Sequence, residues 1–198
     1  IEFDHFENIE KTRLNEININ LIEISKIGFV KSADIIYSLT SKIFENGFGF
    51  RLVSKEEMVN SFMSLHFLKL DKFIKIAFCK SEPIGYIIAL PDLNKILKYS
   101  ARNGDPIKRV YVLIRGLLAM PFIDRGVIQT IALKDSMRKR GVGTEMYKSV
   151  FNEMIRKTYK ECETLLIDVK NKPSIRLAKK FNGRIHKEFE TLHLSLRR

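Results

Sequence analysis

Residues 131–143 are Ile131-Ala132-Leu133-Lys134-Asp135-Ser136-Met137-Arg138-Lys139-Arg140-Gly141-Val142-Gly143, an apolar strand and a basic turn with glycines that precede an amphipathic helix. The first N–H groups of a helix have no partner within it, and the helix dipole is positive there, so such a turn favours an anion. Glycines let a ligand approach the backbone, and cationic side chains add charge-assisted hydrogen bonds. The predicted pyrophosphate site consists of Arg138, Lys139, Arg140, Gly141, Val142, Gly143 and Thr144. Taken alone, the pattern fits a basic surface turn at least as well.

The spacing of the glycines disfavours two other nucleotide-binding motifs. A dinucleotide-binding G-x-G-x-x-G needs a third glycine where this chain has Met146. The sequence also contains no G-x-x-x-x-G-K-[ST] phosphate loop. Both of these nucleotide-binding folds are therefore disfavoured.

Upstream of the turn, periodicity predicts a strand and two helices. Alternation of apolar and polar residues predicts the strand over 17–24. Ser32 is expected to cap a helix that ends at Asn46-Gly47. Ser54 and Glu57 have the spacing of a capping box and predict a second helix. Its expected inward residues are Met58, Val59, Phe62, Met63 and Leu65.

Runs of β-forming residues in the middle of the sequence predict strands. Two β-type runs separated by Lys80 to Pro83 have the form of a hairpin, over Phe73 to Cys79 and Ile84 to Leu90. A short helix or loop over Leu93 to Tyr99 and a turn at Asn103 to Pro106 follow. Further strands are predicted over Arg109 to Ile114 and Val127 to Leu133.

After the glycine turn, the chain returns to alternating helices and strands. The first helix carries Tyr147, Val150, Phe151 and Met154 on one face. The later predicted elements are a strand over Leu165 to Val169, a helix over Ser174 to Phe181 and a strand over Arg184 to Leu196. The length suits one domain, expected over 16–198 behind a lead-in segment over 1–15.

The chain is basic. Its 35 Lys and Arg against 23 Asp and Glu give a formal net charge of +12. This charge attracts polyanions, whether nucleic acid, anionic membrane, acidic carrier protein or phosphate-rich cofactor. The cations are spread through every predicted element, without an aromatic-interleaved stripe or a recognition helix, which disfavours nucleic acid as the partner.

The cysteine count and the hydropathy limit the classes of protein to which the chain can belong. Cys79 and Cys162 are too few for a disulfide framework and form no C-x-x-C pair, so no metal is expected. The most apolar run, Val110 to Ile123, is interrupted and too short for a membrane helix. The sequence starts without a signal-peptide pattern, and we expect a cytoplasmic protein.

Residues 131–143 resemble motif A of the GNAT superfamily of N-acetyltransferases. A second segment, Asn171 to Gly183, is similar to motif B of that superfamily and follows at the familiar distance. The resemblance covers residues 127–190 and extends back to Ile17 through the order of elements. It implies a mixed α/β (α+β) fold with a central, mostly antiparallel sheet that splays between its fourth and fifth strands, and helices on both faces.

The resemblance also implies acetyl-CoA or another acyl-CoA as cofactor. Backbone groups of Ile131, Ala132 and Leu133, on a bulged fourth strand, are expected to hold the pantetheine arm as another strand would. Residues 138–144 then take the pyrophosphate, and Asn171 and Ser174 contact the pantetheine or acyl end. For Asn171, a helix N-cap is the alternative role.

The implied reaction is direct attack of a small-molecule or peptide primary amine on the thioester in a ternary complex, which needs a general base and a general acid. The Tyr acid of many members corresponds to Ala178 here. Their Glu or His on the fourth strand has no counterpart at Val127, Gln129 or Ile131. The candidate substitutes are Asp92, Asp124, Asp168, His186 and His193, of which His193 and Asp92 rank first.

Four questions stay open on the sequence. Pro91-Asp92-Leu93-Asn94 resembles a bacterial GNAT-type subgroup with this motif after the third strand, and Asp92 either faces the acceptor amine or caps a turn. The missing proton-transfer residues make a catalytically weak acyl-CoA-binding domain an alternative to an enzyme. The basic charge equally suits an acyl-carrier protein as donor, and a dimer is one open oligomeric state.

Overall fold

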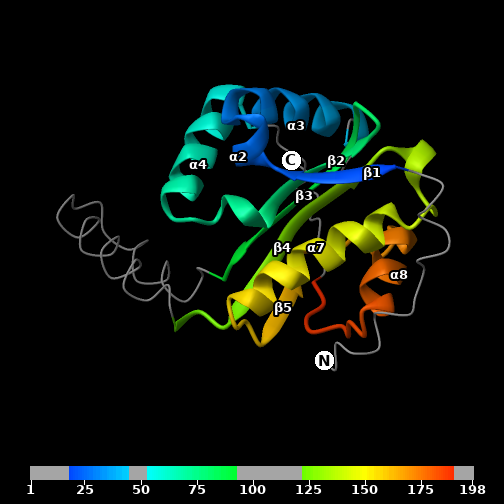
Figure 1. The fold of residues 1–198 in the computed structure, drawn as a ribbon. Coiled ribbons are helices and arrows are strands. Elements are labelled where there is room, and N and C mark those ends of the chain that lie inside the picture. The colour runs from blue at the N-terminus through cyan, green and yellow to red at the C-terminus, as the bar shows by residue number, and fades with distance from the viewer. Residues whose placement is uncertain (1–17, 45–52, 93–121, 190–198) are drawn as a thin grey trace, which may run out of the picture. The chain divides into compact units, whose positions relative to one another are not determined.

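The computed structural model describes residues 18–44, 53–92 and 122–189. The chain divides into two compact units, one over Glu7–Leu165 and one made of Ile1–Phe6 and Leu166–Arg198. The larger unit contains a sheet with strand order β1-β2-β3-β4-β5 (Figure 1). The strands are β1 (Ile19–Glu23), β2 (Ile74–Cys79), β3 (Glu82–Pro91), β4 (Arg125–Leu133) and β5 (Glu161–Thr164). Neighbouring strands are antiparallel except β4 and β5, which are parallel, so the expected mixed sheet is confirmed.

Helices pack on both faces of this sheet (Figure 1). Successive side chains of β2 point to opposite faces of the sheet. Ile74 and Ile76 belong to the buried cluster under α3 and α4, whereas Lys75 points to α7 on the opposite face. The helices of the larger unit are α2 (Ile24–Ile27), α3 (Phe29–Ile43), α4 (Lys55–Phe67) and α7 (Val142–Arg156). A short 3-10 helix, η2 (Asp71–Phe73), leads into β2.

Helix α4 begins where the capping box predicted. Ser54 Oγ accepts a hydrogen bond from Glu57 N at 3.2 Å, and the Glu57 carboxylate accepts one from Ser54 N at 3.1 Å. Phe62 is buried, but the inward position predicted for Met63 is wrong, because 56% of that residue is exposed. The helix therefore packs through a narrower apolar face than its composition indicates.

The cap predicted for the preceding helix is wrong. Helix α3 starts at Phe29 behind Gly28, which has φ 95°. Ser32 lies inside the helix, fully buried, and its hydroxyl donates to the carbonyl of Ile24 at 3.2 Å. The predicted end at Asn46-Gly47 lies outside the described residues, as do the elements predicted over 93–99, 103–106 and 109–114.

The hairpin and the helix after the glycine turn are confirmed. Strands β2 and β3 join through Lys80 and Ser81, and α7 buries Tyr147, Val150 and Met154. The strand predicted over 165–169 is wrong, because β5 ends at Thr164 and the following residues form no strand.

The smaller unit contributes helix α8 (Lys172–Lys180), which confirms the helix predicted over Ser174 to Phe181. The strand predicted over 184–196 is absent from its described part, residues 184–189. The rest of that strand lies outside the described residues.

Candidate functional site

Strand β5 pairs with the first part of β4 along its whole length and ends there. The pairs run from Arg125 with Glu161 to Ile128 with Thr164. The N–H of Leu165 donates to the carbonyl of Ile128 at 3.0 Å, which closes the paired part. Within residues 18–44, 53–92 and 122–189, the rest of β4 pairs with β3 alone. One edge of β4 is thus left without a strand partner there.

A β-bulge at Gln129 decides which backbone groups face this open edge. Ile128 pairs with Ala89 and Thr130 with Ile88, so Gln129 is the extra residue on β4. The N–H of Lys134 donates to Ile84 on β3 at 2.9 Å. Because adjacent residues of a strand point their backbone groups to opposite sides, Ala132 also faces β3, whereas Ile131 and Leu133 face the open edge.

Close approach of β3 to β4 depends on Gly85. A Cβ placed there would lie 2.5 Å from the carbonyl oxygen of Ala132. Glycine at this position therefore allows the two strands to pair closely at the Leu133 end of β4.

The turn between β4 and α7 contains two residues with left-handed backbone. It begins with a 3-10 helix, η4 (Asp135–Met137), and continues through Lys139 at φ 62° to Gly141 at φ 82°. Gly141 is the N-cap of α7, and its carbonyl accepts the first bond of the helix from Glu145 N at 3.1 Å. The N–H groups of Val142 and Gly143 belong to the first turn, which has no acceptors within its own helix.

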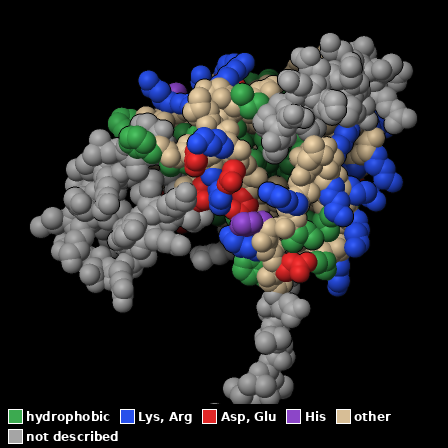
Figure 2. Space-filling view, turned by 90° about the horizontal axis from the view of Figure 1, so that it is seen from below, with side chains coloured by type: hydrophobic (Ala, Val, Ile, Leu, Met, Phe, Trp, Pro, Cys, Tyr) green, Lys and Arg blue, Asp and Glu red, His purple; other side chains and the backbone are tan. Residues whose placement is uncertain are grey.

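The cations of this turn are exposed. Arg138 Nη2 lies 2.9 Å from the carboxylate of Asp135, and both side chains are open to solvent. Lys139 and Arg140 are exposed as well. Lys and Arg side chains are present over most of the described surface visible in Figure 2, with Asp and Glu among them. The turn therefore joins a helix N-terminus to mobile positive charge, the combination that binds phosphate groups.

A buried ion pair, which sequence analysis missed, fixes α7 on the sheet. Lys75 Nζ lies 3.6 Å from Glu153 Oε1, and both side chains are only 10% exposed. Arg156 pairs with the same carboxylate oxygen at 2.9 Å. The signal available in the sequence was a lysine between the apolar residues of β2. This pair orients the helix whose N-terminus forms the turn.

Asp92 lies at the end of β3, buried, beside Arg125. Its N–H donates to the Arg125 carbonyl at 2.9 Å, and its carboxylate lies 4.0 Å from Arg125 Nη1. Arg125 also contacts Glu161 and Glu163. The pKa of Arg125 is raised above its ordinary value, first by the hydrogen bond to Glu161. The carboxylate of Asp92 thus has a permanent cation beside it.

The other candidate acids and bases lie partly in each of the two units. Asp124 lies 4.0 Å from Lys160 Nζ, on the surface. In the smaller unit, Asp168 accepts a hydrogen bond from Lys170 N at 2.8 Å, and His186 is exposed. His193 lies outside the described residues.

The motif B residues form a helix start. Asn171 is the N-cap of α8, and its Oδ1 accepts a hydrogen bond from Ser174 N at 3.3 Å. The capping role that competed with ligand contact is therefore present. Ala178 lies in the second turn of the helix, and its carbonyl accepts bonds from the N–H groups of Phe181 and Gly183.

Two negative findings apply to the part of the chain that the structure describes. It contains no group of three or more His, Cys, Asp or Glu side chains arranged to hold a metal ion. None of the helices described there is long and apolar enough to cross a membrane.

Comparison with known proteins identifies the family. The family model described as Acetyltransferase (GNAT) family matches residues 36–183, which is well over half of the chain. The chain belongs to the GNAT family of acetyltransferases. No curated protein sequence matches this GNAT chain significantly.

Solved structures share the GNAT fold at low sequence identity. An aminoglycoside acetyltransferase from an uncultured soil metagenomic sample, in complex with trehalose, has a TM-score of 0.56 at 11% identity, covering 92% of this chain and 98% of its own. An N-acetyltransferase from Staphylococcus aureus Mu50 has a TM-score of 0.55 at 15% identity, with 83% and 82% covered. Diaminobutyrate acetyltransferase from Paenibacillus lautus, with its substrate L-2,4-diaminobutyric acid and coenzyme A, has a TM-score of 0.52 at 14% identity, with 83% and 75% covered. At these identities the likeness supports the fold alone.

Proposed function

We propose that this GNAT chain transfers an acyl group, acetyl in the first instance, from an acyl-CoA to a primary amine by direct attack in a ternary complex. The observation that carries the proposal is the open edge of β4 leading into the turn at Gly141. Ile131 and Leu133 point their backbone groups to this edge, and the first turn of α7 begins at Val142, nine residues after Leu133. An extended arm ending in a pyrophosphate needs these two features in this order.

The residues present fit a CoA molecule on physical grounds. A pantetheine arm carries amides, so the N–H and C=O groups of Ile131 and Leu133 can bond it as they would a strand. The N–H groups of Val142 and Gly143, with the cations of residues 138–140, suit the pyrophosphate. Bound there, the cofactor supplies an acyl thioester, a carbonyl activated towards amines. We propose Asn171 and Ser174 as further contacts near its acyl end.

Proton transfer is where this chain departs from its relatives. The bulge residue Gln129 is exposed and has no titratable group, and Ala178 cannot donate a proton. We therefore propose that orientation supplies most of the rate and that water carries the amine proton. Asp92 and His193 remain the candidate proton acceptors. The Asp92 carboxylate lies at the end of β3, 4.0 Å from Arg125 Nη1.

A small amine is the acceptor we favour, as for the diaminobutyrate acetyltransferase of similar fold. The resemblance of residues 91–94 to a bacterial subgroup stays a prediction, and Leu93 and Asn94 lie outside the described residues. A donor carried by an acyl-carrier protein, a dimeric state and a cytoplasmic location also stay predictions.

The first experiment measures cofactor binding by thermal denaturation with acetyl-CoA. At about 100 times Kd, ligand binding adds about 2.7 kcal/mol to the unfolding free energy, which raises Tm by about 5–10 °C. Arg140→Ala should weaken binding about five-fold, whereas Lys157→Ala, which removes an exposed lysine at the other end of α7, should leave it unchanged. No stabilisation at saturating acetyl-CoA would refute cofactor binding.

The second experiment measures release of free thiol from acetyl-CoA with a panel of diamines, aminoglycosides and peptides. Amine-dependent release supports the transferase. Acetyl-CoA binding without release for any amine would favour the catalytically weak binding domain instead. Binding and turnover thus separate the two alternatives.

A further inference from the structure

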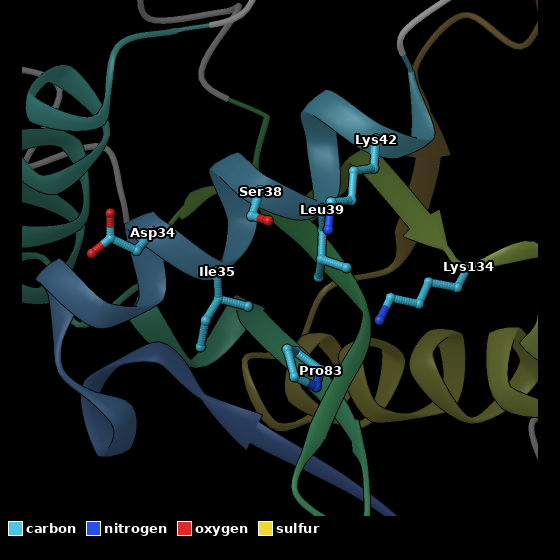
Figure 3. Close-up of a pocket in the computed structure, with 7 residues that line it drawn as sticks. All are labelled: Asp34, Ile35, Ser38, Leu39, Lys42, Pro83 and Lys134. Atoms are coloured by element: carbon cyan, nitrogen blue, oxygen red, sulfur yellow. The ribbon is translucent and has the colours of Figure 1, made fainter.

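A cleft of about 280 Å³ opens between helix α3 and the adjoining ends of β3 and β4 (Figure 3). Ile35, Leu39 and Pro83 form its apolar lining, and Lys42 and Lys134 reach towards the same opening from opposite sides. The cleft lies on the face covered by α3 and on the β3 side of β4. The edge assigned above to the cofactor is on the β5 side, so the two sites are separate.

At the end of the cleft lined by Lys42 and Lys134, the positive and negative charges do not cancel. Lys134 Nζ donates to Glu82 Oε1 at 2.6 Å, and the pKa of Glu82 is lowered first by Lys134 and also by the charge of Lys42. Lys134 is paired with the Glu82 carboxylate, and Lys42 adds a second ammonium group to the lining of the cleft, which leaves one positive charge in excess at this end. Glu82 is 69% exposed, and an ion pair this open contributes little free energy, so an incoming anion can displace it at small cost.

The opposite end of the cleft is electrically neutral. Asp34 Oδ1 lies 2.6 Å from Lys55 Nζ, and this contact raises the pKa of Lys55. The Asp34 carboxylate is thus already occupied by a cation from α4. Ser38, between the two ends, offers a hydroxyl to an occupant.

We propose that this cleft binds a small anion, a carboxylate or phosphate monoester on a short apolar body, at a site separate from the cofactor groove. Its volume is at the low end of ligand sites, which suits a compact metabolite. The cation pair takes the anionic group, and Ile35, Leu39 and Pro83 cover the apolar body. A purely structural role for Lys42, stabilising the C-terminal end of α3, accounts for that lysine but not for its convergence with Lys134 over an apolar lining.

The test is an NMR titration of the isotope-labelled full chain with hexanoate and, separately, butyl phosphate at constant ionic strength. Saturable shifts at Ser38, Leu39 and Lys42, with a Kd of about 1 mM, are expected for a ligand of this size. Lys42→Ala should raise Kd about five-fold. Lys31→Ala, an exposed lysine of the same helix outside the cleft, should leave Kd unchanged.

Three results would overturn the proposal. These are the absence of saturation with either probe, an equal loss of affinity in Lys42→Ala and Lys31→Ala, and displacement of the probe by acetyl-CoA. The last would place the cleft within the cofactor site. Binding of one probe and not the other supports the proposal and identifies the anionic group. Because the direct titration with each probe is carried out before any acetyl-CoA is added, a lack of saturation there leaves the proposed transferase activity untouched.

Discussion

Replacement of Gly141 by alanine tests the backbone of the cofactor turn directly. Gly141 has φ 82° and ψ −13°, a left-handed conformation in which a Cβ costs about 1–2 kcal/mol. Alanine also restricts the unfolded chain, which returns about 0.5 kcal/mol. The expected net loss is about 1 kcal/mol of unfolding free energy, or about 3 °C in Tm.

Urea denaturation followed by circular dichroism measures this loss, and Gly141→Asn is the matched control. Asparagine tolerates left-handed backbone better than alanine, so it should recover about half of the lost free energy. Acetyl-CoA titrations of the same variants then show whether strain in the turn also weakens binding. If Gly141→Ala is as stable as the parent chain, or if alanine and asparagine destabilise it equally, the left-handed turn is not the source of the effect.

Three further predictions concern the packing around the site. Lys75→Ala leaves the buried carboxylate of Glu153 with only its surface partner, so it should destabilise the fold by about 3 kcal/mol in urea denaturation, whereas the double variant Lys75→Met, Glu153→Leu should cost far less. Tyr86→Phe removes the buried 2.7 Å hydrogen bond between Tyr86 and Thr40 and should cost about 1 kcal/mol in the same assay. Burial raises the pKa of Cys162 to about 12, so the thiol stays protonated at pH 8; iodoacetamide at pH 8, followed by mass spectrometry, should leave Cys162 unmodified until urea unfolds the chain.

Local sequence patterns were sufficient to predict a helix where neighbouring residues mark its first turn or its buried face. The capping box at Ser54 positioned α4, and the apolar spacing of Tyr147, Val150 and Met154 predicted the buried face of α7. Both depend on groups within four residues of one another. Interactions of that range can be read from a single sequence.

Predictions failed where the backbone just outside the recognised pattern, or a partner strand far along the chain, decides the outcome. Ser32 has the chemistry of a cap, but Gly28 starts α3 earlier and the hydroxyl bonds to Ile24 instead. The apolar run from Leu165 was predicted as the fifth strand, yet Leu165 is 49% and Leu166 78% exposed, and the polar residues Glu161–Thr164 pair with β4. Strand pairing at this edge follows from the partner strand rather than from local hydropathy.

The bulge at Gln129 shows how one residue links the core to the proposed cofactor edge. Before the bulge, Gly126 faces α7, where an added Cβ would lie 2.5 Å from Met154. With strict alternation Ala132 would face α7 as well, and its backbone groups would point to the open edge. The extra residue reverses both the face of the side chain and the direction of the backbone groups. The Ala132 side chain therefore belongs to the buried cluster under α3, and the backbone groups of Ile131 and Leu133 face the open edge. Removal of Gln129 would therefore exchange core side chains and edge backbone groups together, which is why neither can be inferred from the hydropathy of β4 alone.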